Sequence, residues 1–512
     1  MHMKKLSFIF ALSVLLFVKG NAQDRIMLIA DPHVLPQTII TADPNFSTKN
    51  ENEIKMFRLS ESIWHALMDT AMAYRPSLVL IPGDLSRNGE PAALDTVAAG
   101  LARLENAGIR TLVIPGNHDL PDNVDWDSLF AGTYVNAVRD DASYSYAVSP
   151  LEGVTVIGID ATDGSAGTGV VRPATKDFIL TQIDSATAKG NTIIAMCHWQ
   201  ILENFDKQGE LEPACRLQDA DAFRDTLMAH GVHVVLTGHF HVNGISTFRD
   251  TTGLTNDSIV EISTGSPITF PCSYRWLNIS ADRTTLEVKT DYITSLDTIA
   301  DMYAFSRQWV EEHAVNLVPT LAVRAWNKVD AKWDTSIAPL LTQLGLGTWA
   351  ASLKATLPST NEERIDLTQR HMGAPIVNLY VFHSEANENE RPELGEQLAN
   401  AVYTGMENLV DEMLSSNMMI KTVFGPIISP MAVAMAEEPV QSIVEDITQR
   451  VSAMHSDQTN DLHLTLKVNG ENPHEDIDEI RATNKAVKTL RDGQILILRG
   501  DKTYTVQGTE IK

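Results

Sequence analysis

The sequence of 512 residues predicts an α/β domain, followed by a mainly α-helical region and a short β-hairpin tail. In the first half of the chain, five short apolar runs typical of buried strands each end in polar or charged residues. Beyond about Asp291, apolar residues recur at the spacing typical of helices. Two alternating runs separated by a turn stand near the C-terminus. A chain of this length is expected to form two or more domains.

The first segment, residues 1–22, is predicted to be a cleaved signal peptide. Lys4 and Lys5 precede an apolar run, and small residues stand ahead of Ala22 where a signal peptidase reads the chain. A membrane anchor is disfavoured, because the apolar run has about 13 residues and a span needs about 20. We therefore expect an exported protein without a transmembrane helix, located in the periplasm, on the cell surface or outside the cell.

Polar groups follow each of the five strand-like runs, and sites in α/β sheets are built where strands end. The five runs are residues 26–30, 78–82, 111–115, 192–196 and 232–237. The groups that follow them are Asp31-Pro32-His33, Gly83-Asp84, Gly116-Asn117-His118-Asp119, Cys197-His198 and Gly238-His239-Phe240-His241.

These residue types suit a pair of metal ions. A dinuclear site with ions about 3.5–4 Å apart needs a bridging carboxylate. Asp84 is the best candidate, because Gly83 before it has no side chain and lets the ions and a phosphate approach the backbone. Mixed imidazole and oxygen donors suit Mn, Fe or Zn, so two divalent transition-metal ions are the predicted cofactors. The other predicted ligands are Asp31, His33 and His241 for one ion, and Asn117, His198 and His239 for the other.

His118 is predicted to be catalytic. It stands one residue beyond a ligand, where it can protonate the leaving-group oxygen or stabilise its charge. Asp119 either orients that imidazole or caps a helix. Each motif alone is also typical of an ordinary turn, and His198 has the weakest local context, because residues 196–199 also resemble a core strand with a buried histidine.

Taken together, the motifs resemble the pattern D-x-H, GD, GNH-D/E, H and GHxH of the calcineurin-like metallophosphoesterase family, over about residues 24–291. Residues 83–90 and 107–119 look most like its cyclic-nucleotide phosphodiesterase-like branch. In purple acid phosphatases of the family a metal-binding tyrosine stands where this chain has Arg87, so a tyrosinate-bound iron is not expected.

The resemblance implies a four-layer α/β/β/α sandwich for residues 23–295 and an enzyme that hydrolyses a small phosphate ester through a hydroxide held between the two ions. A phosphodiester or cyclic nucleotide is the leading substrate. Two alternatives stay open: a phosphomonoesterase or nucleotidase using the same site, and a catalytically silent binding protein with the same fold.

The composition is acidic. The formal net charge is −26, and it becomes −29 once Lys4, Lys5 and Lys19 leave with the signal peptide. Such a surface repels polyanions, which disfavours long nucleic acids as partners. The three cysteines allow at most one disulfide. Nothing in the sequence indicates the oligomeric state.

Residues 296–475 are predicted to form the mainly helical domain, with a strand-like run at residues 376–382 that leads into an acidic loop. Residues 480–512 form the predicted tail, with a hairpin of residues 494–499 and 503–506. The tail resembles those of exported Bacteroidetes proteins, some of which are sorting signals. A terminal hairpin that completes a sheet is the alternative.

Overall fold

The computed structural model describes most of residues 23–415, residues 462–468 and the strands between residues 487 and 511. The gaps in the first range are residues 47–52, 121–123, 163–167, 205–207, 212, 251–256, 344, 346, 356 and 387–390. The predicted signal peptide lies outside the described residues.

The first sheet has six strands in the order β13-β12-β11-β1-β2-β3. Strands β1 (Asp24–Leu28), β2 (Leu78–Pro82) and β3 (Arg110–Ile114) are parallel, with Met27 opposite Val79 and Val79 opposite Thr111. Strands β11 (Ser273–Ile279), β12 (Thr285–Tyr292) and β13 (His463–Lys467) extend the sheet in antiparallel pairs. The carboxyl ends of the three parallel strands therefore meet at one edge.

The second sheet has seven strands in the order β4-β5-β6-β7-β8-β10-β9. Its parallel centre consists of β6 (Val154–Ile159), β7 (Thr192–Cys197), β8 (Val234–Thr237) and β10 (Ser258–Ser263). The antiparallel strands β4 (Val138–Arg139) and β9 (Gly244–Arg249) form its two edges, and the antiparallel β5 (Tyr146–Leu151) lies between β4 and β6. All five predicted runs are strands of these two sheets.

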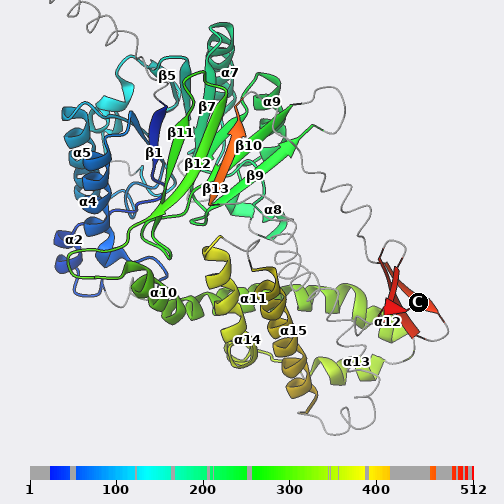
Figure 1. The fold of residues 1–512 in the computed structure, drawn as a ribbon. Coiled ribbons are helices and arrows are strands. Elements are labelled where there is room, and N and C mark those ends of the chain that lie inside the picture. The colour runs from blue at the N-terminus through cyan, green and yellow to red at the C-terminus, as the bar shows by residue number, and fades with distance from the viewer. Residues whose placement is uncertain are drawn as a thin grey trace, which may run out of the picture. The chain divides into compact units, whose positions relative to one another are not determined.

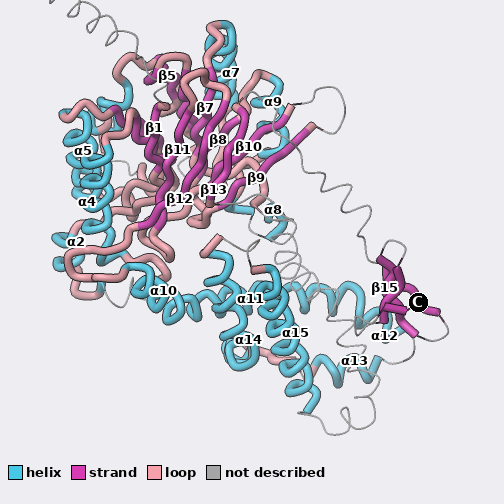
Figure 2. The backbone as a smooth tube through the Cα atoms, in the orientation of Figure 1, coloured by secondary structure: helices cyan, strands magenta, loops and turns pink. Residues whose placement is uncertain are grey.

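The two sheets pack face to face, and helices cover both outer faces (Figures 1 and 2). Alternate residues of each strand point to opposite faces, so Leu28 of β1 and Met196 of β7 share the core between the sheets, whereas Met27 packs outward. The outer helices are α4 (Phe57–Tyr74) and α5 (Pro91–Asn106) on the first sheet, and α7 (Pro173–Ala188) and α9 (Ala220–Ala229) on the second. The expected four-layer α/β/β/α sandwich is confirmed.

Shorter elements fill the connections. They are the α-helices α2 (Gln37–Ala42), α6 (Trp126–Leu129) and α8 (Gln208–Leu211), the 3₁₀ turns at residues 131–134, 213–215 and 314–317, and a π-helical turn at residues 333–337.

The region after the sheets is helical, as predicted. Its helices are α10 (Met302–His313), α11 (Val318–Lys332), α12 (Ala338–Gln343), α13 (Gly347–Lys354), α14 (Asn361–Ser384) and α15 (Pro392–Ser415). Trp326 of α11, Leu367 of α14 and Val402 of α15 share a core. Met302 and Val310 of α10 instead pack against residues of the sandwich. In the described part of the chain, no helix has the length and apolar character needed to cross a membrane.

The strand predicted at residues 376–382 is wrong, because this run lies inside α14. A capping box starts the helix, with the Thr360 hydroxyl accepting from the Glu363 N–H. Val377 and Val381, one helical turn apart, then pack in the same core as Val310. Tertiary packing has overridden the strand preference of these branched residues.

The predicted terminal hairpin is present as β15 (Gln494–Arg499) and β16 (Lys502–Thr505), with Arg499 opposite Lys502. Strands β14 (Val487–Arg491) and β17 (Glu510–Ile511) extend it to a four-stranded sheet. Residues 472–512 form a compact unit of their own, and these strands pair with one another instead of completing either sheet of the sandwich.

Candidate metal centre

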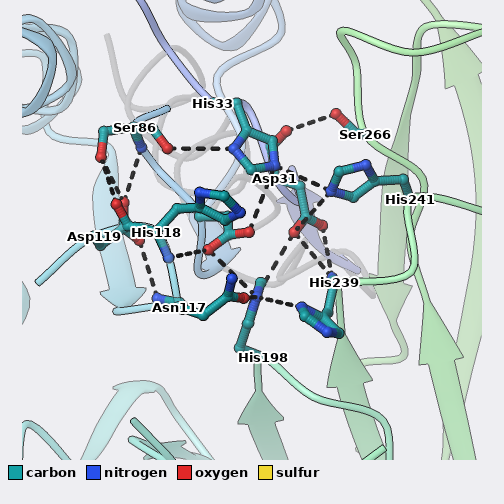
Figure 3. A network of polar contacts seen from close by, with 12 residues as sticks. Asp31, His33, Ser86, Asn117, His118, Asp119, His198, His239, His241 and Ser266 are labelled. Atoms are coloured by element: carbon teal, nitrogen blue, oxygen red, sulfur yellow. Dashed lines mark hydrogen bonds and ion pairs between the residues drawn. The ribbon is translucent and has the colours of Figure 1, made fainter. Parts of the chain in front are cut away.

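The structure brings the seven predicted ligands together at the strand ends. Figure 3 shows the side chains of Asp31, His33, Asn117, His198, His239 and His241 pointing toward one another. The potential ligand atoms form two groups, and within each group all atoms lie within 4.8 Å of one another. One consists of Asp31, His33, Asp84 and His241, and the other of Asp84, His198 and His239. Asp84 is common to both groups, which is the geometry that a bridging carboxylate needs.

The carboxylate of Asp84 divides its oxygens between the two groups. Its Oδ2 lies 3.5 Å from His33 Nε2, and its Oδ1 lies 3.4 Å from His198 Nε2. On the first side, His241 Nε2 lies 3.0 Å from His33 Nε2 and 3.6 Å from Asp31 Oδ1.

On the second side, two further atoms that could bind a cation lie close to His198 Nε2. It lies 3.1 Å from His239 Nδ1 and 3.0 Å from the amide oxygen of Asn117. Asn117, His198 and His239 therefore lie together on the Oδ1 side of Asp84.

Outside contacts fix the ring orientation of three of these histidines. His33 Nδ1 lies 3.3 Å from the Ser86 carbonyl, His198 Nδ1 lies 2.8 Å from the Pro82 carbonyl, and His239 Nε2 lies 3.1 Å from the Ala214 carbonyl. A carbonyl only accepts, so each of these nitrogens carries the proton and donates it. The opposite nitrogen of each ring then presents a lone pair to the cluster. Lone pairs and carboxylate oxygens that converge in this way fit cations.

Burial makes the cluster costly without cations. The side chains of Asp31, His33 and His198 are fully buried. Burial and the neighbouring charge of Asp84 together raise the pKa of Asp31 to about 8, although His198 opposes the shift. Burial also lowers the pKa of His239 to about 3. Burial alone would lower the pKa of His198, but Asp84 and Asp31 outweigh it and raise that pKa to about 9. In the absence of metal, protons on Asp31 and His198 therefore take the place of cations.

The backbone at the centre is held in a conformation that side chains rarely allow. Five of the seven predicted ligands have a positive φ: Asp31 (49°), His33 (40°), Asp84 (51°), His239 (67°) and His241 (61°). Such angles are uncommon for residues other than glycine and persist where the surrounding structure fixes them, often at functional sites.

Two glycines make the close approach of the loops possible. Gly83 has a φ of 95°, and a Cβ on it would lie 2.6 Å from His198 Nδ1. A Cβ on Gly116 would collide with the Asp84 carboxylate. The space beside Gly83, expected to admit ions and phosphate, is thus needed by the ligand His198.

His118 lies at the rim of the cluster. Its backbone N–H donates to Asp84 Oδ1 over 3.0 Å, and its ring centroid lies 5.0 Å from that of His33. The ring nitrogen Nδ1 lies 2.8 Å from the amide oxygen of Asn88. Burial lowers the pKa of His118, although Asp84 opposes the shift.

The expected role of Asp119 needs correction. Its carboxylate accepts from the backbone N–H groups of Leu85, Ser86 and Gly116 and from the Ser86 hydroxyl, over 2.9–3.0 Å. These bonds join the loop after β2 to the loop after β3. Asn88, and not Asp119, contacts the His118 imidazole, and no helix of the described residues begins at Asp119.

Sequence reasoning missed several residues that support the centre. Ser86 and Asn88 lie in the stretch that suggested the phosphodiesterase-like branch, but their types alone did not identify them. Ser266 donates from its hydroxyl to the Asp31 carbonyl over 2.6 Å. Glu261 accepts from the N–H groups of Ile201 and Leu202, 2.7 Å each, in the loop after His198. No local pattern marks either residue.

Comparison with known proteins identifies a family for residues 24–243. The model of the family described as calcineurin-like phosphoesterase matches residues 24–243. No curated protein matches the chain significantly. Among solved structures, a dimetal phosphatase from Danio rerio has 16% identity and a TM-score of 0.40, over 52% of this chain and 95% of its own. A purple acid phosphatase from yellow lupin (Lupinus luteus) seeds has 12% identity and a TM-score of 0.34, over 53% and 52%.

The family match covers the five motifs from Asp31 to His241. Arg87 remains where the resemblance to purple acid phosphatases would need a tyrosine. Residues 24–243 thus belong to a calcineurin-like phosphoesterase domain, and the expected enzyme class, a phosphoric ester hydrolase, is confirmed with it.

Proposed function

We propose that this chain is an exported phosphoesterase that uses two divalent metal ions to hydrolyse a small phosphate ester. The observation that carries the proposal is the convergence of imidazole lone pairs and carboxylates around Asp84. Ions bound there would neutralise the charge of a phosphate and lower the pKa of bound water.

The residues of the chain divide the remaining work. The seven ligands would hold the two ions, with Asp84 available to both. His118 stands beside these ligands, and Asn88 holds one edge of its ring. It can supply a proton, or a hydrogen bond, to the oxygen of the leaving group. No side chain of the chain needs to act as the nucleophile.

The metals are proposed to be Mn, Fe or Zn, because the donors mix imidazole nitrogen with hard oxygen. Reconstitution with each ion in turn, followed by elemental analysis and activity assays, will rank them. A preference for calcium or magnesium would contradict this part of the proposal.

The substrate class is proposed from the sequence resemblance of two segments. The resemblance of residues 83–90 and 107–119 to the phosphodiesterase-like branch makes a phosphodiester or cyclic nucleotide the leading candidate, with phosphomonoesters and nucleotides as the alternative. The test is the turnover of a monoester, a diester and 2′,3′- and 3′,5′-cyclic nucleotides by metal-reconstituted protein. Failure to hydrolyse any of them, with two ions bound, would favour the catalytically silent binding protein.

Export is proposed from residues 1–22. N-terminal sequencing of protein from the producing cells should begin at Gln23. An uncleaved N-terminus on cytoplasmic protein would contradict it.

A further inference from the structure

Lys55 stands beside the metal centre on a segment that the motifs did not include. Phe57, the first residue of α4, is buried, and its ring meets the His33 ring edge-on with 6.4 Å between centroids. The Nζ of Lys55 lies 5.9 Å from the centroid of the same Phe57 ring. The ammonium group and a predicted metal ligand thus share one aromatic neighbour.

Contacts on both sides fix this segment. The Met56 N–H donates to the Ile268 carbonyl over 2.8 Å, in the loop between β10 and β11. The Trp309 indole of α10 donates to the Glu53 carbonyl over 3.1 Å. The backbone that carries Lys55 is therefore held in place between the sandwich and the first helix of the helical region.

The charge of Lys55 acts on the centre. Burial lowers the pKa values of His33 and His241, and Lys55 lowers them more than any other neighbouring charge does. Lys55 also lowers the pKa values of Asp31 and His118. Among the described residues, no carboxylate forms an ion pair with Lys55, whereas the nearby Arg87 pairs with Glu90 at 3.0 Å.

A lysine in this position adds a positive charge beside two expected cations. Like charges repel, and the repulsion is strong where water is excluded. An anion with charge to spare that lies between the ammonium and the ions would relieve this repulsion. A phosphate group with a free, negatively charged oxygen is such an anion.

We propose that Lys55 binds a non-bridging oxygen of the reacting phosphate and thereby selects dianionic phosphate monoesters over monoanionic diesters. The inference rests on the proposed two-metal phosphoesterase function and favours the phosphomonoesterase or nucleotidase alternative over the leading diester. In a diester, the oxygen facing Lys55 carries a substituent or belongs to a group with one charge fewer, so the lysine contributes less.

The test uses the full chain with both metals bound and three variants. Lys55→Gln removes the charge, and Lys55→Arg keeps it. Lys176→Gln is the matched control, because Lys176 Nζ also lies 5.9 Å from a phenylalanine ring, that of Phe223 in α9, which packs on the outer face of the second sheet. Three quantities are measured: bound metal per chain, the Kd of inorganic phosphate by calorimetry, and kcat/KM for p-nitrophenyl phosphate and bis(p-nitrophenyl) phosphate.

We expect Lys55→Gln to keep two ions, with unchanged or tighter metal binding, because a like charge has gone. The Kd of phosphate should rise about tenfold or more, the range for a lost hydrogen bond to a charged group. The kcat/KM for the monoester should fall at least as much and that for the diester less than about threefold. Lys55→Arg should recover most of the loss, and Lys176→Gln should match wild type.

Equal losses on both esters, or unchanged phosphate binding, would overturn the role of Lys55. Weaker metal binding in Lys55→Gln would also overturn it, because it would show a merely structural effect. If wild-type protein with two ions hydrolyses neither ester, the proposed function fails, while the phosphate Kd still decides whether Lys55 binds the anion.

Discussion

Among single residues, Asp84 bears most directly on the centre, because each of its oxygens faces a different imidazole. Asp84→Asn replaces one oxygen with an amide nitrogen and removes the negative charge. We expect it to bind fewer than two ions per chain and to lose activity. Elemental analysis after dialysis measures this, and two ions retained with wild-type affinity would exclude a bridging role.

His118 is expected to act on the leaving group and not on the metals. His118→Asn should keep the metal content and lower turnover by about 10²–10⁴ for esters with poor leaving groups, the range typical of a lost general acid. Activated aryl esters should lose less. If good and poor leaving groups suffer equally, His118 binds the phosphate instead of donating a proton.

The protons held by the metal-free centre predict a pH dependence. The folded-state pKa is about 8 for Asp31 and about 9 for His198, against ordinary values of 3.8 and 6.5. Between pH 6.5 and 9 these two groups therefore hold more protons in the folded chain than in the unfolded chain, so their contribution to the free energy of unfolding falls as the pH rises. Bound metal replaces these protons and should remove the dependence.

Urea unfolding at a series of pH values from 6.5 to 9 checks this expectation, once with a chelator and once with excess metal. The chelated protein should lose stability toward pH 9 and the loaded protein should lose much less. Parallel curves would show that these groups do not hold protons in the folded state.

At the level of secondary-structure elements, the centre depends on how closely the loops after β2 and β3 approach. Gly116→Ala places a Cβ against the Asp84 carboxylate. Either the carboxylate or the loop must move, so we expect metal content to fall with it. Gly373→Ala in α14 is the control, because its Cβ would meet no atom within 4 Å. Normal metal content in Gly116→Ala would show that the loops are not held as closely as described.

The strands and their ends were predictable because two local signals coincide. Leu78–Pro82 is apolar throughout, as expected for a strand buried on both faces, and the ligand Asp84 follows within two residues. Residues 376–382 carry the same kind of apolar signal without a strand, because the cap at Thr360 and packing against Val310 decide their structure. The contacts of Asp119 could not be predicted from the sequence either, because they depend on the approach of a loop that lies more than thirty residues earlier in the chain.

For the molecule as a whole, two contacts between described residues join the helical region to segments beside the metal centre. The Phe240 ring, between His239 and His241, lies 5.9 Å from the His383 ring of α14. The Trp309 indole holds the Glu53 carbonyl near Lys55. Neither contact could be predicted from the sequence, because each joins residues more than a hundred positions apart. The pairing of β13 with β12 is of the same kind.

Trp309→Phe tests whether the helical region supports the centre. It removes the hydrogen bond to Glu53 but keeps an aromatic ring, and a typical hydrogen bond contributes about 0.5–1.5 kcal/mol. We expect a loss of about two- to tenfold in phosphate affinity with unchanged metal content. Trp326→Phe is the control, because its indole donates over 3.3 Å to Thr368 within the helical core. Equal effects of the two variants would indicate a general loss of stability.

The most direct test of the two-metal centre is the number of ions bound per chain. Wild-type protein, stripped with a chelator, reloaded with Mn, Fe or Zn and freed of excess metal, should contain two ions per chain by elemental analysis. A value of one or none at saturating metal, in protein that is folded, would contradict the account.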